Sequence, residues 1–403
     1  MLLYGLAALL SLGRTVLSAP PPVTGQTARE PWEYEAVIVG GGPSGLSAAS
    51  GLARVRRNIL VLDSGEYRNQ ATRHMHDVLG FDGVEPAYYR YQGRQQILEY
   101  STVTMRNGTV TKIQTIKTPD YTYFCVVYTS PAGETVNTTA GKIVLGTGLR
   151  DKLPSTPGFS ENWGKGIYWC PWCDGHEHAD QELGIIGPFD QAASTVLEIL
   201  TLNKNVIAFV NGTDTPAEQE LTTQKTPIWQ SILSENKVRV ENRTMKSIVR
   251  LRNGTDGYHD PGKASTAELD KFRVDFEDGP SVTRDAFLVN IPNELASSVG
   301  PDMGVSLLGG RLQADNSKGL MTNVPGVFAV GDANSDNSTN VPHALYSGKR
   351  AAVFLHIQLE REAADRKAKA GKPNKRSVLD VRSVWEEMNG QEGSLLHAGE
   401  LKE

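Results

Sequence analysis

A short strand that runs into a glycine loop constrains the fold of this 403-residue chain more than any other feature. Residues 35–39 are mostly apolar and β-branched, and residues 40–45 read Gly-Gly-Gly-Pro-Ser-Gly. Residues 46–55 are mostly small and apolar, which predicts a helix. A second apolar run over residues 58–63 completes a β-α-β unit. Such a unit predicts an α/β fold with a parallel, doubly wound sheet.

The glycine loop has the spacing of a dinucleotide-binding site. In the pattern G-x-G-x-x-G, the glycines allow a tight turn, the approach of the backbone to a pyrophosphate, and close packing of helix on strand. The phosphates then rest on the N-terminus of the following helix. Asp63 ends the second strand and is placed to accept hydrogen bonds from ribose hydroxyls. We therefore expect a dinucleotide to contact Gly40, Gly41, Gly42, Pro43, Ser44, Gly45 and Asp63.

A second strand-turn-helix pattern begins in the middle of the chain, with a strand over residues 183–187 and a helix over 190–200. The chain returns to the first domain near residues 286–291, because residues 326–332 form an apolar strand ending in Gly-Asp and are followed by another helix. The sequence thus predicts two Rossmann-like domains, the second inserted in the first. The expected boundaries are 34–152 and 288–362 for the outer domain and 153–287 for the inserted one.

Both ends of the chain lie outside these domains. Residues 1–18 are apolar and resemble a secretory signal peptide, followed by a linker over 19–33; an N-terminal extension is the alternative, because Arg14 interrupts the apolar run. The run is too short to span a bilayer, so we expect no integral membrane span. Residues 363–403 are charged and predict a solvated tail. Six Asn-x-Ser/Thr acceptors favour a secreted glycoprotein: Asn107, Asn137, Asn211, Asn242, Asn253 and Asn337.

The composition limits which partners the protein can bind and which roles its cysteines can have. The net charge is −5, and no basic block interleaved with aromatics occurs, so we expect no nucleic-acid partner. Three cysteines are too few for a disulfide-stapled scaffold. Cys125 lies in an apolar run that predicts a strand, where we expect a buried, inert thiol.

The other two cysteines form the motif Cys170-Pro171-Trp172-Cys173. Thiols spaced in this way can close and reopen a small disulfide ring, and the C-x-x-C context lowers a thiol pKa. Asp174 and His176 follow directly and could move protons to and from sulfur, although a surface polar role is the alternative for His176. Half of a zinc site is the other explanation of the cysteines, but no second C-x-x-C or H-x-x-x-H completes four ligands, so we expect no metal.

Four elements occur in the order and spacing of a known family: the glycine loop, Gly146-Thr147-Gly148, the C-x-x-C-D-G motif, and Gly331-Asp332 before a helix. Together they resemble the low-molecular-weight thioredoxin reductases, over about residues 34–358. The resemblance implies FAD in the outer domain, contacted at Gly146, Gly331 and Asp332, with the cysteines near the flavin ring. It also implies Asp174 as the acid that protonates a leaving thiol, and a homodimer.

The inserted domain departs from that family at its own glycine loop. Thioredoxin reductases carry G-x-G-x-x-A there, with arginines for the NADPH 2′-phosphate after the next strand. In this chain Phe189 occupies the middle glycine position, Asp190 adds a negative charge beside it, and residues 209–214 contain no arginine. We therefore expect that the NADPH site is lost.

The strings at residues 62–69, 74–77, 80–83 and 170–177 resemble the fungal gliotoxin-oxidase-type flavoproteins, which close disulfides in dithiol metabolites with oxygen. This resemblance implies that Asn69 and the region from His74 lie near the flavin ring, and that Val341, Pro342 and His343 cap it. His343 is then a candidate proton acceptor, or else a structural histidine that opens a helix.

The leading hypothesis is an FAD-dependent thiol oxidase that acts on a small-molecule or peptide dithiol and passes electrons to O2. By family analogy Cys173 would contact the flavin and Cys170 would attack the substrate. An NAD(P)H-dependent reductase and a non-catalytic flavin-binding scaffold are the alternatives.

Overall fold

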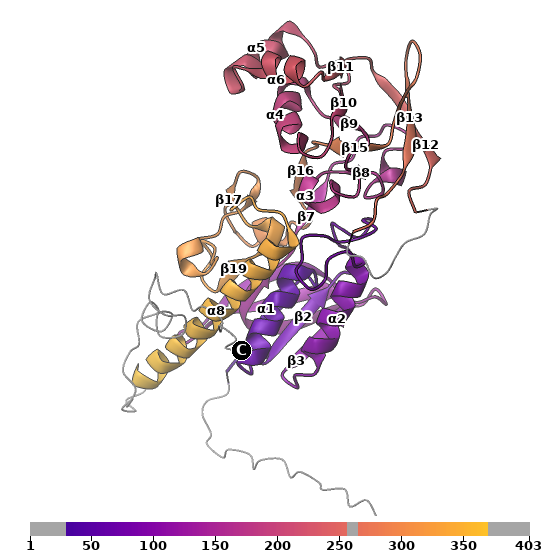
Figure 1. The fold of residues 1–403 in the computed structure, drawn as a ribbon. Helices are drawn as coiled ribbons and strands as arrows, with labels where there is room; N and C mark the ends of the chain where they lie inside the picture. The colour runs from indigo at the N-terminus through magenta and orange to yellow at the C-terminus, as the bar shows by residue number, and fades with distance from the viewer. Residues whose placement is uncertain (1–29, 256–264, 370–403) are drawn as a thin grey trace, which may run out of the picture. The chain divides into compact units, whose positions relative to one another are not determined.

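The computed structural model describes residues 30–255 and 265–369 (Figure 1). The predicted signal peptide, most of the linker and most of the C-terminal tail lie outside these residues. Within the two described ranges, no helix has both the length and the apolar character needed to cross a membrane.

The first domain is built on a mixed sheet with the strand order β3-β2-β1-β6-β5-β4, in which β19 also pairs with β6. The strands β1, β2, β3 and β19 run parallel to their partners, whereas β4, β5 and β6 form an antiparallel meander. The predicted β-α-β unit is confirmed as β1, α1 and β2. The strands are β1 (Tyr34–Val39), β2 (Ile59–Asp63), β3 (Val103–Asn107), β4 (Thr109–Lys117), β5 (Thr122–Thr129), β6 (Thr135–Leu145) and β19 (Val327–Ala329).

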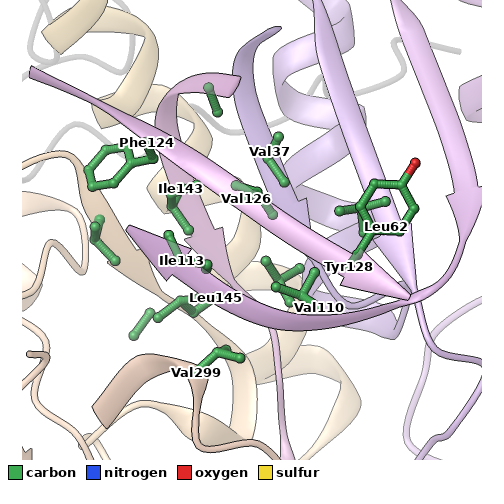
Figure 2. Packing of buried hydrophobic residues seen from close by; sticks show 14 of the residues in the cluster. Val37, Leu62, Val110, Ile113, Phe124, Val126, Tyr128, Ile143, Leu145 and Val299 are labelled. Atoms are coloured by element: carbon green, nitrogen blue, oxygen red, sulfur yellow. The ribbon is translucent and has the colours of Figure 1, made fainter. Parts of the chain in front are cut away.

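Both faces of the parallel strands are buried, which explains why β1 and β2 are almost continuously apolar. Ile38 packs toward α1 (Pro43–Arg54) and α8 (Val341–Lys369), which lie side by side in Figure 1. Val37 points to the opposite face, because strand side chains alternate. Figure 2 shows it among Val110, Phe124 and Val299 in the core that the meander covers.

The second domain has a parallel sheet with the order β11-β10-β9-β15-β8 and an antiparallel sheet with the order β12-β13-β14. The parallel strands are β8 (Ile167–Tyr168), β9 (Glu182–Ile186), β10 (Asn205–Phe209), β11 (Arg239–Glu241) and β15 (Ala286–Val289). The antiparallel strands are β12 (Met245–Arg252), β13 (Lys271–Phe276) and β14 (Val282–Arg284). The helices are α3 (Pro171–Asp174), α4 (Phe189–Ile199), α5 (Pro216–Lys225) and α6 (Trp229–Glu235).

The remaining elements join or extend the first domain: α2 (Pro86–Leu98), α7 (Val299–Asp302), β17 (Leu307–Leu308) and β18 (Arg311–Leu312). The chain leaves and returns through an antiparallel pair, β7 (Leu149–Asp151) and β16 (Asn293–Leu295). The strand β15 crosses the expected boundary between residues 287 and 288, because it pairs with β9 in the second sheet, and we place the end of the inserted domain after Val289. Helix α8 continues past residue 362 to Lys369.

The expectation that Cys125 is a buried thiol is wrong. Cys125 lies on β5, as predicted, but it is only partly buried. Its neighbours Phe124 and Val126 point into the core, so the alternation of the strand turns Cys125 to the opposite face.

The contact between α1 and α8 yields a stability prediction. A Cβ atom at Gly348 would lie 2.2 Å from the carbonyl oxygen of Ser44. We expect Gly348→Ala to lower the free energy of unfolding by about 1–3 kcal/mol through overpacking, even though alanine favours a helix by about 1 kcal/mol. Urea unfolding measures this. The exposed neighbour Lys349→Ala is the control, with an expected change within about 0.5 kcal/mol; a Gly348→Ala variant as stable as the wild type would contradict the packing argument.

Candidate active site

The glycine loop and the backbone at Gly146 come into close contact at the carboxyl end of β1. Gly40 has φ +105°, and a Cβ atom there would lie 2.3 Å from the carbonyl oxygen of Gly146. A Cβ atom at Gly45 would lie 1.9 Å from the carbonyl oxygen of Gly40, so this glycine packs the helix onto the strand. Helix α1 begins at Pro43 without a side-chain cap, which leaves its first amides available to phosphate oxygens.

A cavity of about 1000 Å³ opens beside this loop, a size typical of cofactor sites. The predicted site residues that line it are Gly40, Gly41, Gly42, Pro43, Ser44, Asp63, Asn69, Gly146, Cys170, Cys173, Asp174, Asp332 and Val341. Gly45 and Gly331 support the wall from behind: Gly331 has φ +65°, and a Cβ atom there would lie 2.6 Å from Ser44 Oγ. The structure thus brings together the phosphate loop and the cysteines, which are 125 positions apart between Gly45 and Cys170.

The cavity has polar groups suited to FAD. Thr147 Oγ1 is buried at the wall and has no hydrogen-bond partner among the described residues. At the end of β2, Asp63 Oδ2 accepts hydrogen bonds from Tyr67 Oη at 2.5 Å and from Arg94 at 2.6 Å. Burial and the hydrogen bond to Asp63 raise the pKa of Tyr67 to about 12. The donor set and the glycine cradle therefore fit a dinucleotide, with Asp63 at its ribose end.

Arg68 organises the middle of the cavity, and the sequence did not single it out. Its guanidinium donates two hydrogen bonds to Asp151, at 2.9 and 2.7 Å, and one to Asp332 at 3.0 Å. Burial raises the pKa of Asp332, whereas Arg68 and Arg311 oppose this shift. Arg68 also lies 5.2 Å from the ring centre of Trp169, the residue before Cys170.

The cysteines form a disulfide at the wall of the cavity. Cys170 precedes α3, and its carbonyl oxygen accepts a hydrogen bond from the amide of Cys173 at 3.1 Å. Trp172, between them, is 72% exposed. Trp163 and Trp169 line the same cavity as the cysteines, and their rings stack with centres 5.1 Å apart.

Asp174 is the titratable group next to the disulfide. Although it lines the cavity, the surrounding protein desolvates its carboxyl group, and this burial raises its pKa to about 7. The carboxylates of Glu268 and Glu177 add to the shift, and His178 opposes it. A carboxyl group with such a pKa can hold and release a proton near neutral pH, which suits a general acid.

The two predicted histidines do not line the cavity. His176 is exposed on the turn after α3. His343 lies in the first turn of α8, with Nε2 at 2.9 Å from Asp336 Oδ2, an arrangement that agrees with the structural alternative. Instead, the buried His178 contacts Asp174, with Nδ1 2.8 Å from its carbonyl oxygen. No sequence pattern identifies His178 as a functional residue. Only its closeness to the C-x-x-C motif could have drawn attention to it.

Fold and site together define a protein with two dinucleotide-type domains and a C-x-x-C disulfide at the wall of a cavity of cofactor size. The family model of the pyridine nucleotide-disulphide oxidoreductases matches residues 34–348. A probable thioredoxin reductase from Arthroderma benhamiae is 46% identical over 368 residues, which cover 90% of each chain. Thioredoxin reductase tcpT from Claviceps purpurea is 32% identical over 335 residues, 81% of this chain and 94% of the relative.

Solved structures agree with these relatives. The crystal structure of HlmI aligns with a TM-score of 0.70 and 28% identity, over 84% of this chain and 96% of that chain. An oxidoreductase from Agrobacterium tumefaciens aligns with a TM-score of 0.66 and 26% identity, over 81% and 99%. The chain belongs to the pyridine nucleotide-disulphide oxidoreductase family. It is a thioredoxin reductase-like oxidoreductase, and FAD is its cofactor.

The raised pKa of Asp174 predicts a pH-dependent stability. Between its ordinary pKa near 3.8 and about 7, the folded protein binds more protons at this group than the unfolded chain, so stability falls as pH rises through this window. Asp174→Asn removes that loss, and its stability relative to the wild type is expected to grow by up to about 1.4 kcal/mol per pH unit. Urea unfolding of the oxidised proteins at several pH values measures this. Asp120→Asn removes an exposed charge as a control; a constant difference for Asp174→Asn would refute the assignment.

Proposed function

We propose that this protein is an FAD-dependent dithiol oxidase: it closes a disulfide in a dithiol substrate through Cys170 and Cys173, and O2 is the final electron acceptor. The proposal rests on the position of Phe189. In a relative that uses NADPH, the backbone at this position would come close to the pyrophosphate of the cofactor.

Phe189 fills the start of α4. Its side chain is 2% exposed and meets the ring of Trp229 edge-on at 5.2 Å. Its amide donates a hydrogen bond to Thr213 Oγ1 at 2.9 Å, so a donor that phosphate would need is already used. The crevice beside Gly187 and Pro188 has no room for a water molecule. Asp190 adds a carboxylate to this turn and pairs with Lys225.

The 2′-phosphate of NADPH also lacks its usual partner. Residues 210–214, which follow β10, contain no arginine, and Asn211 in this segment accepts a hydrogen bond from the amide of Met245 at 2.8 Å. Arg243, which follows β11, donates to Glu241 and to the carbonyl oxygens of Asp278 and Pro280. These contacts favour a route in which electrons enter from a dithiol.

The residues support a balanced exchange. A substrate thiolate attacks Sγ of Cys170, and the bond to Cys173 breaks; Asp174 protonates the departing Cys173 thiolate. The second substrate thiolate then attacks the substrate sulfur of the mixed disulfide and releases Cys170, which leaves the substrate oxidised by two electrons. Bound FAD supplies the step that takes two electrons from the cysteine dithiol and passes them to O2. The net reaction converts one dithiol and one O2 into one disulfide and one hydrogen peroxide.

An NAD(P)H-dependent disulfide reductase is the second candidate, and the names of the relatives favour it. It requires nicotinamide binding by a route other than the turn that Phe189 fills. A non-catalytic scaffold is less favoured, because an acid with a pKa of about 7 lies beside a disulfide at the cofactor cavity.

Anaerobic reduction of the flavin distinguishes these functions. We expect dithiothreitol to bleach the flavin absorbance of the purified protein, readmitted oxygen to restore it, and NADPH at micromolar concentration to leave it unchanged. Cys170→Ser and Cys173→Ser should each keep the flavin but lose most of the bleaching by dithiothreitol, because neither variant can form the disulfide. Bleaching by NADPH would establish the reductase, and no bleaching by either donor would favour the scaffold.

We also propose that the protein is a secreted glycoprotein and a homodimer. Five of the six acceptor asparagines are exposed, namely Asn107, Asn137, Asn211, Asn242 and Asn337, whereas Asn253 is partly buried and accepts a hydrogen bond from Arg73. A mass decrease on treatment with an endoglycosidase, after expression in a eukaryotic secretory host, tests the first statement. Light scattering tests the second.

A further inference from the structure

A cluster of buried charges lies directly behind the disulfide, and the proposed reaction does not use it. We call Arg73, His178, Arg250, Glu268 and Asp270 the Arg73 cluster. The side chain of Asp270 is fully buried, and those of Arg73 and Glu268 are 10% and 11% exposed. Taking so many charges out of water is costly unless each is paired, so the arrangement requires specific geometry.

Arg73 ties two separate parts of the chain together. It lies in the segment between β2 and α2, close to Asn69 and His74, which line the cavity. Its guanidinium donates to both oxygens of Asp270, at 2.8 and 3.0 Å, and it also pairs with Glu268. Asp270 directly precedes β13 of the inserted domain. The wall of the cavity is therefore bonded to the domain that carries the cysteines.

His178 continues the connection to the disulfide motif. Its Nε2 lies 3.7 Å from Asp270 Oδ2 and 3.8 Å from Glu268 Oε2. On the other side, Nδ1 lies 2.8 Å from the carbonyl oxygen of Asp174, the last residue of α3. The ring stacks on Tyr168 at 5.2 Å, which fixes its orientation. Burial alone lowers the pKa of His178, but Asp270 and the Asp174 carbonyl outweigh it, and the net shift is upward.

A metal site is the other explanation of this cluster, because ligand atoms of His178, Glu268 and Asp270 lie within 4.8 Å of one another. However, the guanidinium groups of Arg73 and Arg250 already bond the carboxylate of Asp270, and Arg73 also pairs with Glu268. A divalent cation would face these positive charges at close range. The contacts therefore describe an ion-pair cluster.

We propose that Arg73 is a positioning residue, which acts through Asp270 and His178 to hold the turn of Cys170 and Cys173 against the flavin cavity. The proposal rests on electron transfer between the cysteines and the flavin, a step that the oxidase and the reductase share. Without Arg73, Asp270 loses its link to the cavity wall, and Glu268 keeps only its contact with His74 there, at 3.2 Å. The cysteine turn is then held less firmly at its distance from the cofactor.

Two readouts on Arg73→Met test this role. The first is the rate of anaerobic flavin reduction by dithiothreitol in stopped flow, which we expect to fall about 10- to 100-fold, since small misplacements of reacting groups have effects of this size. The second is independent of turnover: the rate at which iodoacetamide alkylates Cys170 and Cys173 in the reduced protein should rise several-fold, because the turn is less confined. Peptide mass spectrometry separates these two cysteines from Cys125.

Two further variants make the outcome decisive. Arg273→Met breaks a partly exposed ion pair with Asp275 on the same strand β13, and both rates should match the wild type. Arg73→Lys keeps the charge but not the paired hydrogen bonds, so an intermediate flavin-reduction rate is expected; it carries the test if Arg73→Met fails to fold or to retain flavin.

Wild-type flavin reduction in both Arg73 variants would overturn the proposal. So would slow reduction with unchanged alkylation, since the cysteines would then not have moved. The Arg73 variants do not test which molecule accepts the electrons. If oxygen failed to restore the flavin absorbance, the oxidase function would be overturned, but the role of Arg73 would be unaffected.

Discussion

The site depends on the close approach of three backbone segments at the carboxyl end of the first sheet. A Cβ atom at Gly40 would collide with the carbonyl of Gly146, and one at Gly331 would collide with Ser44. At Gly146 a Cβ atom would lie 3.2 Å from Ser44 Oγ, a tight contact. Because of this contact, the ends of β1, β6 and β19 together form one wall of the cavity. The first backbone amides of α1 are directed at the cavity. A side chain at Gly40 would push the loop away from Gly146, and one at Gly45 would push α1 away from Gly40, so both glycines are needed for the shape of the phosphate site.

Charge placement then gives the two ends of the cavity different chemistry. At the ribose end, Asp63 is held by Tyr67 and Arg94, whereas Asp174 beside the disulfide lies where burial raises its pKa to about 7. Two carboxylates of similar intrinsic acidity are thus set to different tasks by their surroundings. The same domain that presents Asp174 has a buried phenylalanine, Phe189, in its own strand-helix turn, and the proposed oxidase function rests on this residue.

Much of the fold and of the candidate site could be predicted from the sequence, because the spacing of residues in local patterns identifies them. The glycine loop, the strand-helix alternation of both domains and the C-x-x-C pair each follow local patterns, and the fold class is confirmed. Arg68, Arg73 and His178 could not be found in this way, since their partners lie far along the chain: Arg73 meets Asp270 across 197 positions. No periodicity marks such contacts. His176 was singled out by its proximity to the cysteines, but the turn after α3 exposes it and buries His178 instead. The ends of β15 and α8 also differ from the expected boundaries, because sheet pairing and helix packing set them.

In the proposed oxidase function electrons pass from a dithiol to oxygen, and this route fixes the stoichiometry of turnover. An oxygen electrode and a peroxide assay would follow the purified flavoprotein with dithiothreitol and no nicotinamide. We expect one O2 consumed and one hydrogen peroxide formed for each dithiol oxidised, with no turnover in Cys173→Ser. Flavin-replete protein that consumes no oxygen with the dithiol, but reduces disulfides at the expense of NADPH, would contradict the proposed oxidase function.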